Sequence, residues 1–185
     1  MHRDAYRQFL DAFIPKVQAL KVGDVLDERT DVGPMITVEA AQRVERWIAE
    51  ARDGGADIAL GGTRRGAFLD PTVLLQTTPA MKVNCEEVFA PLVTVTPYTR
   101  LDDAVAAVNS SPYGLQAGVF TRDVQTLFRL HAELDVGGVN GNDIPGFRVD
   151  RLPYGGAKAS GLGREGVRYA IEEMTELRVL TLKLD

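Results

Sequence analysis

The sequence predicts an α/β fold with a mostly parallel, doubly wound sheet, in which helices cover both faces. Between residues 92 and 141, short apolar runs alternate with segments of helical period, in the order β-α-β-α-β. This order gives parallel strands joined by right-handed crossovers. The 185 residues suffice for one well-buried core, and no internal repeat, low-complexity tract or linker divides them.

The segments before residue 92 are expected to add two helices and two short strands. Residues 4–21 place apolar side chains at helical spacing, with Pro15 as an expected kink. Thr37 is placed to cap a second helix, which should end at the Gly54–Gly55 pair. The two strands are expected in ADIALGG and in FLDPTVLLQ, where Pro71 indicates an edge or a bend.

The segments that carry the β-α-β-α-β order also indicate where a site would lie. They are strand VTVT, helix LDDAVAAVNSS, strand LQAGVFTRD, helix DVQTLFRLHAEL and strand VGGVNGN. Ligands of such sheets bind beyond the carboxyl ends of the strands. The loops after Val139 and around Glu86–Glu87 are therefore candidate site loops.

Composition argues against several classes of function. The formal net charge of -5 and the sequence pI of about 5.1 do not favour nucleic-acid binding. No apolar run has the length of a membrane span, and the first residues lack a signal-peptide pattern. The single cysteine, Cys85, can form no internal disulfide, so a reducing cytoplasm is the expected location.

The histidines point to neither a metal site nor a catalytic one. The chain has only His2 and His131, and no Cys/His cluster has metal-ligand spacing, so no metal is expected. Because His131 falls within an expected helix, we expect it on the surface of that helix rather than in a nucleophile–base pair.

The stretch GLGREG, Gly161–Gly166, has the G-x-G-x-x-G spacing of a dinucleotide-binding turn. That turn needs a buried strand directly before its first glycine, so that the following helix N-terminus faces the phosphates. A helix (VRYAIEEMTE) and a strand (LRVLTLKL) are expected after it, but the preceding RLPYGGAKAS is typical of a loop. The glycines are therefore expected to serve a tight loop before a helix.

Several stretches occur along the chain in a recognisable order: VGDVLDERTDVGPMI, GGTRRGAFLDPTVL, EEVFAPLVTV, NSSPYGLQAGVFTRD, GGVNGND and PYGGAKASGLGREG. Together they resemble the C-terminal part of the catalytic domain of the aldehyde dehydrogenase superfamily, over essentially the whole chain. The segment FRVDRLPYGGAKASGLGREGVRYAIEEMTE is most similar to the branch that includes lactaldehyde and non-phosphorylating glyceraldehyde-3-phosphate dehydrogenases.

The resemblance implies a catalytic-domain fold of aldehyde dehydrogenase type, truncated at its N-terminal end. Residues 1–176 would be the catalytic-domain portion, and residues 177–185 would be a C-terminal strand that packs between subunits. Left unpaired, such an alternating apolar strand would be an exposed edge that tends to pair with another chain.

The resemblance also implies a chemistry that this chain holds only in part. In the family a cysteine thiolate attacks the aldehyde, a hydride passes to NAD or NADP, and water cleaves the thioester. The family's nucleophile, general-base glutamate and dinucleotide domain all precede the matched region, and the chain has no G-Q-x-C stretch. Cys85 lies in a different motif. The chain alone is therefore expected to be inactive and to bind no cofactor tightly.

Two residues match family positions at the nicotinamide ribose. Glu87 would accept hydrogen bonds from the ribose hydroxyls, and Phe89 would pack beside the ring. Without the resemblance, a charged strand start followed by a core phenylalanine is the favoured interpretation. Ala90 departs from the glycine that is usual in the family, so its methyl group is expected to affect the position of this loop.

Further residues match the family's aldehyde entrance and its proton path. The loop from Asn140 to Leu152 would line the entrance, and Glu165 matches a glutamate near the proton exit path. Arg148 and Arg151 could face an anionic group of the substrate, because guanidinium groups pair bidentately with carboxylate or phosphate. Each is equally typical of a solvated loop arginine. The candidate substrate-binding residues are Asn140, Phe147, Arg148, Arg151 and Tyr154.

The sequence supports a leading hypothesis and several alternatives. The first is a C-terminal catalytic-domain fragment of an NAD(P)-dependent aldehyde dehydrogenase that oxidises a small aldehyde, one that carries an anion if the arginines face it. The second is a free-standing, non-catalytic homo-oligomer that associates through the C-terminal strand. A third has a separately encoded N-terminal half completing the site. Residual activity through Cys85 is the least expected.

Overall fold

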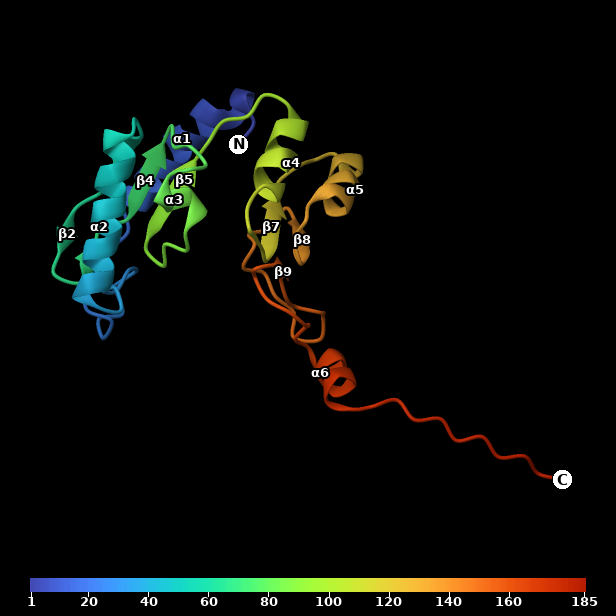
Figure 1. The fold of residues 1–185 in the computed structure, drawn as a ribbon. Helices are drawn as coiled ribbons and strands as arrows, with labels where there is room; N and C mark the ends of the chain where they lie inside the picture. The colour runs from blue at the N-terminus through green and yellow to red at the C-terminus, as the bar shows by residue number, and fades with distance from the viewer. The chain divides into compact units, whose positions relative to one another are not determined.

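The computed structural model describes residues 1–185, which form two compact units, Met1–Leu101 and Asp102–Asp185 (Figure 1). The first unit contains a three-stranded sheet with helices packed against it. The second unit contains two separate strand pairs and shorter helices. The predicted α/β class with parallel strands is confirmed.

The sheet of the first unit has the strand order β1-β4-β5. These strands are Asp57–Leu60, Thr72–Leu75 and Leu92–Val95, where β4 runs parallel to β5 and antiparallel to β1. A small hairpin of β2 (Arg64–Arg65) and β3 (Phe68–Leu69) lies in the connection from β1 to β4. Both predicted strands therefore form, and Pro71 lies at the break between β3 and β4.

The pairing of β1 with β4 differs from the predicted parallel pattern. A parallel return requires a crossover of a dozen or more residues, usually a helix. Residues 61–71 contain only the short hairpin, so β4 comes back antiparallel to β1. In addition, β5 pairs with β4 while β7 pairs with β8, so the β-α-β-α-β segment is shared between two sheets.

Three helices belong to the first unit: α1 (Arg3–Gln18), α2 (Val38–Asp53) and α3 (Lys82–Cys85). Pro15 lies inside α1, within the helix expected over residues 4–21. Thr37 caps α2, since its hydroxyl accepts a hydrogen bond of 3.1 Å from the Ala40 amide. Gly54 follows as the C-cap of α2.

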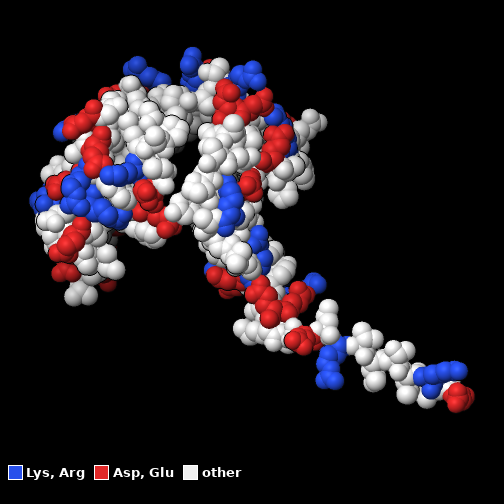
Figure 2. Space-filling view, in the orientation of Figure 1, with Lys and Arg blue, Asp and Glu red and all other residues white.

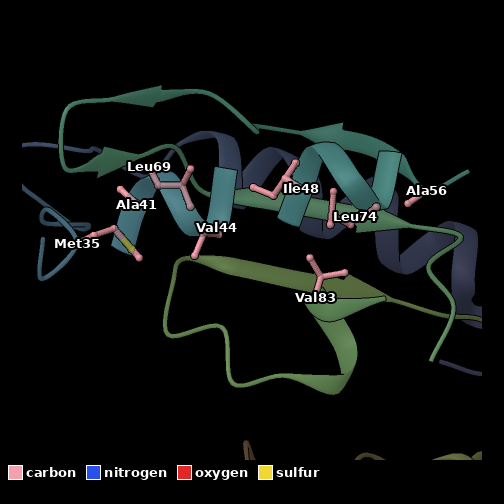
Figure 3. Close-up of a cluster of buried hydrophobic side chains, with 9 residues drawn as sticks. Met35, Ala41, Val44, Ile48, Ala56, Leu69, Leu74 and Val83 are labelled. Carbon is pink, nitrogen blue, oxygen red and sulfur yellow. The ribbon is translucent and has the colours of Figure 1, made fainter. Parts of the chain in front are cut away.

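The core of the first unit forms where α2 meets the sheet (Figure 3). Apolar side chains recur every three or four residues along α2, which places them on one face. Leu69 and Leu74 are completely buried. The buried cluster consists of Met35, Ala41, Val44, Ile48, Ala51, Ala56, Leu69, Leu74 and Val83.

The second unit confirms the predicted crossover of two parallel strands. Strand β7 (Gln116–Val119) leads through α5 (Val124–Glu133) to β8 (Gly138–Gly141), and the two strands pair in parallel. The other elements are α4 (Leu101–Asn109), β6 (Tyr113–Gly114), β9 (Ala157–Lys158) and α6 (Val167–Met174), with β6 and β9 antiparallel.

Helix α5 begins at a side-chain cap. The Asp123 carboxylate accepts hydrogen bonds from the Thr126 hydroxyl and from the amides of Gln125 and Thr126. These bonds, chiefly the one from the hydroxyl, favour the charged form and lower the pKa of Asp123 below its ordinary value. This cap fixes the turn between the end of β7 and the helix.

The last residues, 176–185, contain no helix or strand and follow α6 as an extended chain (Figure 1). The predicted C-terminal strand therefore finds no partner within the chain. Figure 2 shows a mostly uncharged segment there. Its exposed apolar side chains are Leu177, Val179, Leu180, Leu182 and Leu184.

None of the helices combines the length and the apolar character that crossing a membrane requires. No group of three or more His, Cys, Asp or Glu side chains is arranged to hold a metal ion. Over the face visible in Figure 2, basic and acidic side chains lie close to one another.

The core position of Leu74 predicts a large effect on stability. Replacing Leu74 by Ala removes buried methyl groups and leaves a cavity against α2, so the free energy of unfolding should fall by about 2–5 kcal/mol. The matched control is Leu26→Ala, because Leu26 is 88% exposed. Urea denaturation followed by circular dichroism measures both. A Leu74→Ala midpoint equal to that of Leu26→Ala would contradict this view of the core.

Candidate functional site

The segment Glu86–Pro91 joins α3 to β5 in the first unit. It is termed the cofactor loop below because the resemblance places the two expected cofactor residues in it. Val88 and Ala90 pack against the buried core cluster. The alternate residues, Glu87 and Phe89, are exposed. Packing of every second side chain thus presents a carboxylate and an aromatic ring on the outside of the unit.

The two presented side chains are available for a ligand. The Glu87 carboxylate has no hydrogen-bond or ion-pair partner within the chain, and the Phe89 ring is 79% exposed. Phe89 has φ of 48°, a left-handed conformation that costs a non-glycine residue roughly 1–3 kcal/mol. A carboxylate with free acceptor positions fits a ribose diol, and an exposed ring fits a flat nicotinamide. Phe89 is therefore not the core residue that the sequence favoured without the resemblance.

Ala90, which replaces the glycine usual in the family, packs inward beneath the loop. Its side chain is half-buried and packs against the core cluster rather than projecting outward with Phe89. The methyl group thus fills space beneath the loop and leaves the exposed face to Glu87 and Phe89.

Arg43 on α2 binds the backbone of the cofactor loop. Its guanidinium donates hydrogen bonds to the carbonyl of Val88 at 3.0 Å and, at the longer distance of 3.5 Å, to that of Glu87. The guanidinium carbon also lies 4.4 Å from the centre of the Trp47 ring. Sequence reasoning missed both residues. The available signal was their spacing of four, which places an arginine over an aromatic ring on one helix face.

In the second unit, Asn140 is fixed at the carboxyl end of β8. Its side-chain amide donates hydrogen bonds to the Gln116 side-chain oxygen and to the Ile144 carbonyl, both at 3.1 Å. Gln116 lies on the neighbouring strand β7. The predicted site loop therefore starts from a residue that is held by its own sheet, and Gln116 is a second partner that the sequence did not reveal.

Arg148, Tyr154 and Glu165 form one cluster. The Arg148 guanidinium donates a hydrogen bond of 2.8 Å to the Glu165 carboxylate and lies 4.5 Å from the centre of the Tyr154 ring. The backbones of Tyr154 and Glu165 exchange hydrogen bonds of 3.1 and 2.6 Å. The structure thus joins a predicted substrate residue to the predicted proton-path residue.

The other predicted entrance residues stand apart from this cluster. Phe147 is exposed, and Arg151 is exposed without a hydrogen-bond or ion-pair partner in the chain. The two arginines are therefore unlike: Arg148 is already paired with a carboxylate, whereas Arg151 has its donors free. A free guanidinium can bind an anion without first breaking an ion pair.

The GLGREG loop has the structure of a tight turn before a helix. Gly161, Gly163 and Gly166 have φ of 128°, 74° and 119°, values that other residues rarely adopt. The strand before them, β9, has two residues, and Gly166 directly precedes α6. The expectation that the glycines serve the loop is confirmed. A hollow of about 290 Å³ lies against this loop and is bordered by Tyr154 and Glu165.

Cys85 and His131 are not paired with each other or with a carboxylate. The Cys85 thiol is partly exposed and approaches only the Ala80 carbonyl, at 3.6 Å. His131 is exposed on α5, as predicted. The side chains described above can bind a diol, a flat ring and an anion, and they can carry protons.

Comparisons with known proteins lead to one family. The aldehyde dehydrogenase family profile matches residues 1–180. The chain is 48% identical to the 3-sulfolactaldehyde dehydrogenase of Priestia megaterium over 184 residues, which are 100% of this chain and 39% of that protein. The chain thus spans about two-fifths of the length of these curated relatives.

Solved structures agree with the sequence comparisons. The crystal structure of aldehyde dehydrogenase 21 from Physcomitrella patens, in complex with the reaction product succinate, is 41% identical, with a TM-score of 0.95 over 98% of this chain and 38% of its own. The NADP complex of a glyceraldehyde-3-phosphate dehydrogenase from Methanocaldococcus jannaschii is 40% identical, with a TM-score of 0.88 over 94% of this chain and 38% of its own. The chain therefore belongs to the aldehyde dehydrogenase family.

Proposed function

We propose that this chain is the C-terminal catalytic-domain portion of an NAD(P)-dependent aldehyde dehydrogenase that oxidises a small aldehyde to a carboxylic acid. The observation that carries the proposal is the family match across residues 1–180, in a chain that spans only 39% of such a relative. In this proposal, the nucleophile and the dinucleotide domain are supplied by the rest of the protein.

The residues of this chain then bind, orient and move protons. Glu87 accepts hydrogen bonds from the nicotinamide ribose hydroxyls, and Phe89 packs beside the ring. NAD or NADP, when bound, accepts the hydride that leaves the aldehyde carbon. Glu165 takes up protons that leave the reacting centre. Without a cysteine thiolate on the aldehyde carbonyl there is no covalent route, so the chain alone is inactive and holds no cofactor tightly.

The substrate class that we propose is a short aldehyde with an anionic group at its far end. The support within the chain is Arg151, an exposed guanidinium without a partner. Further support comes from the names of the relatives: one acts on a sulfonate-bearing aldehyde, one structure holds the dicarboxylate succinate, and one enzyme is named for a phosphorylated aldehyde. Sulfonate, carboxylate and phosphate all suit a guanidinium fork.

The first experiment is to determine the mass of the native polypeptide and to assay it. Peptides of this chain in source-cell lysate should belong to a species much larger than 20.2 kDa, and the purified species should reduce NAD or NADP in the presence of a short aldehyde. A native species near 20.2 kDa without turnover, and without a cysteine-bearing partner that co-purifies, would overturn the proposal. Turnover that survives Cys85→Ala would exclude Cys85 as its nucleophile.

Substituting Arg151 should change substrate preference in the dehydrogenase that contains this chain. A hydrogen-bonded charge pair is worth about 1.5–3 kcal/mol, so Arg151→Gln should lower kcat/KM for an aldehyde ending in a carboxylate by about 10–100-fold. The value for the neutral aldehyde of equal length should stay unchanged. The control is Arg122→Gln, another exposed and unpaired loop arginine. If Arg148→Gln alone removed the preference, Arg148 would be the anion-binding residue.

A second candidate function is non-catalytic association, which the exposed apolar side chains of residues 177–185 favour. In both functions, we propose that this segment forms a strand by pairing with another subunit. An isolated extended segment leaves its backbone groups unpaired, and alternating apolar residues at such an edge invite addition of a strand.

Truncation after Thr175 tests that role. Full-length chain should form an oligomer in light scattering coupled to gel filtration, and the truncated chain should elute as a monomer because its pairing edge is gone. The control replaces Arg178 and Lys183 by Ser, which changes the charges of the segment and keeps its leucines. An unchanged oligomer after truncation would show that association uses another surface.

A further inference from the structure

The geometry points to Arg43 as a positioning residue of the cofactor loop. We infer that Arg43, held by Trp47, fixes the backbone that presents Glu87 and Phe89, and so sets the affinity for the cofactor without touching it. The role in cofactor binding rests on the proposed function. The contact of Arg43 with the loop stands independently of it.

The hydrogen bonds of the loop show where it needs support. At its ends, the Glu86 amide donates to the Lys82 carbonyl at 3.1 Å, and the Thr72 amide donates to the Pro91 carbonyl at 2.8 Å. Between its ends, the loop makes one backbone bond, which the Ala90 carbonyl accepts from the Leu92 amide of β5 at 2.7 Å. The carbonyls of Glu87 and Val88 are bonded by Arg43 alone.

The Arg43 side chain is suited to hold two carbonyls at once. A guanidinium presents its donors in a rigid plane, whereas an ammonium is a single point donor. Here the plane is itself held by the Trp47 ring, 4.4 Å away, four residues along the same helix. Both side chains are half-buried, so this contact is partly shielded from water.

The two carbonyls that Arg43 binds, those of Glu87 and Val88, belong to the peptide units whose orientation sets which side chains face outward. Val88 points into the core, while Glu87 before it and Phe89 after it are exposed. Phe89 also holds a left-handed φ of 48°, from which it would relax if its neighbours were released. Rotation of the peptide units around Val88 would move the carboxylate and the ring together, and Arg43 opposes that rotation.

The test begins with cofactor affinity in the dehydrogenase that contains this chain. Arg43→Met keeps much of the apolar stem and removes the donors, so it should raise the Kd for NAD(P)+ about tenfold. Arg43→Lys should recover part of this loss through one carbonyl. Arg46→Met is the matched control, because Arg46 lies on the same helix, exposed and without a partner. It should leave the Kd unchanged.

A double-mutant cycle separates positioning from a general loss of structure. If Arg43 acts through Glu87, then Arg43→Met in a Glu87→Gln background should change the Kd by less than about twofold. Independent effects that multiply in the double variant would overturn the inference. A Glu87→Gln variant with unchanged Kd would count against the proposed ribose contact instead.

Amide hydrogen exchange on the chain itself tests the contact without any cofactor. Arg43→Met should speed exchange of the Leu92 amide, whose acceptor is in the loop, by about fivefold or more because local opening becomes easier. The Asp70 amide, bonded to the Thr63 carbonyl at 2.9 Å, is the internal reference and should not change. Equal exchange at Leu92 in wild type and Arg43→Met would overturn the inference.

Discussion

The contact between α2 and β4 is the constraint on which the first unit depends. Val44 and Ile48 from the helix and Leu74 from the strand belong to one buried cluster. Burying apolar area of this kind is the main favourable contribution to folding. The same packing brings the polar edge of α2, with Arg43, to the loop before β5. A helix that secures the core therefore also supports the segment that carries the candidate cofactor residues.

The sequence predicted the local features well because their causes lie within a few residues. The Thr37 cap, Pro15 within a helix and the β7-α5-β8 crossover follow from spacing and residue type, and the structure contains each of them. The antiparallel pairing of β4 with β1 was harder to predict, because it depends on the absence of a crossover helix in residues 61–71. Knowledge of strand pairing was needed to see it.

The sequence predicted which residues belong to the candidate site. It did not predict which of them contact one another. Glu87 and Phe89 were named from a resemblance, and the structure adds why they face outward. The bond from Arg43 to the Val88 carbonyl joins residues 45 positions apart, a distance over which helical or strand period carries no information. The same limit applies to Arg148 and Arg151, which looked equivalent in sequence until one was found paired with Glu165.

The stacked pair of Arg43 and Trp47 has a practical consequence, because Trp47 is the single tryptophan among the 185 residues. The emission of an indole depends on the polarity and mobility of its immediate surroundings. This ring lies between the buried cluster and the guanidinium that holds the cofactor loop. The chain therefore carries an intrinsic fluorophore beside the contact that holds this loop, so release of the contact should change its emission.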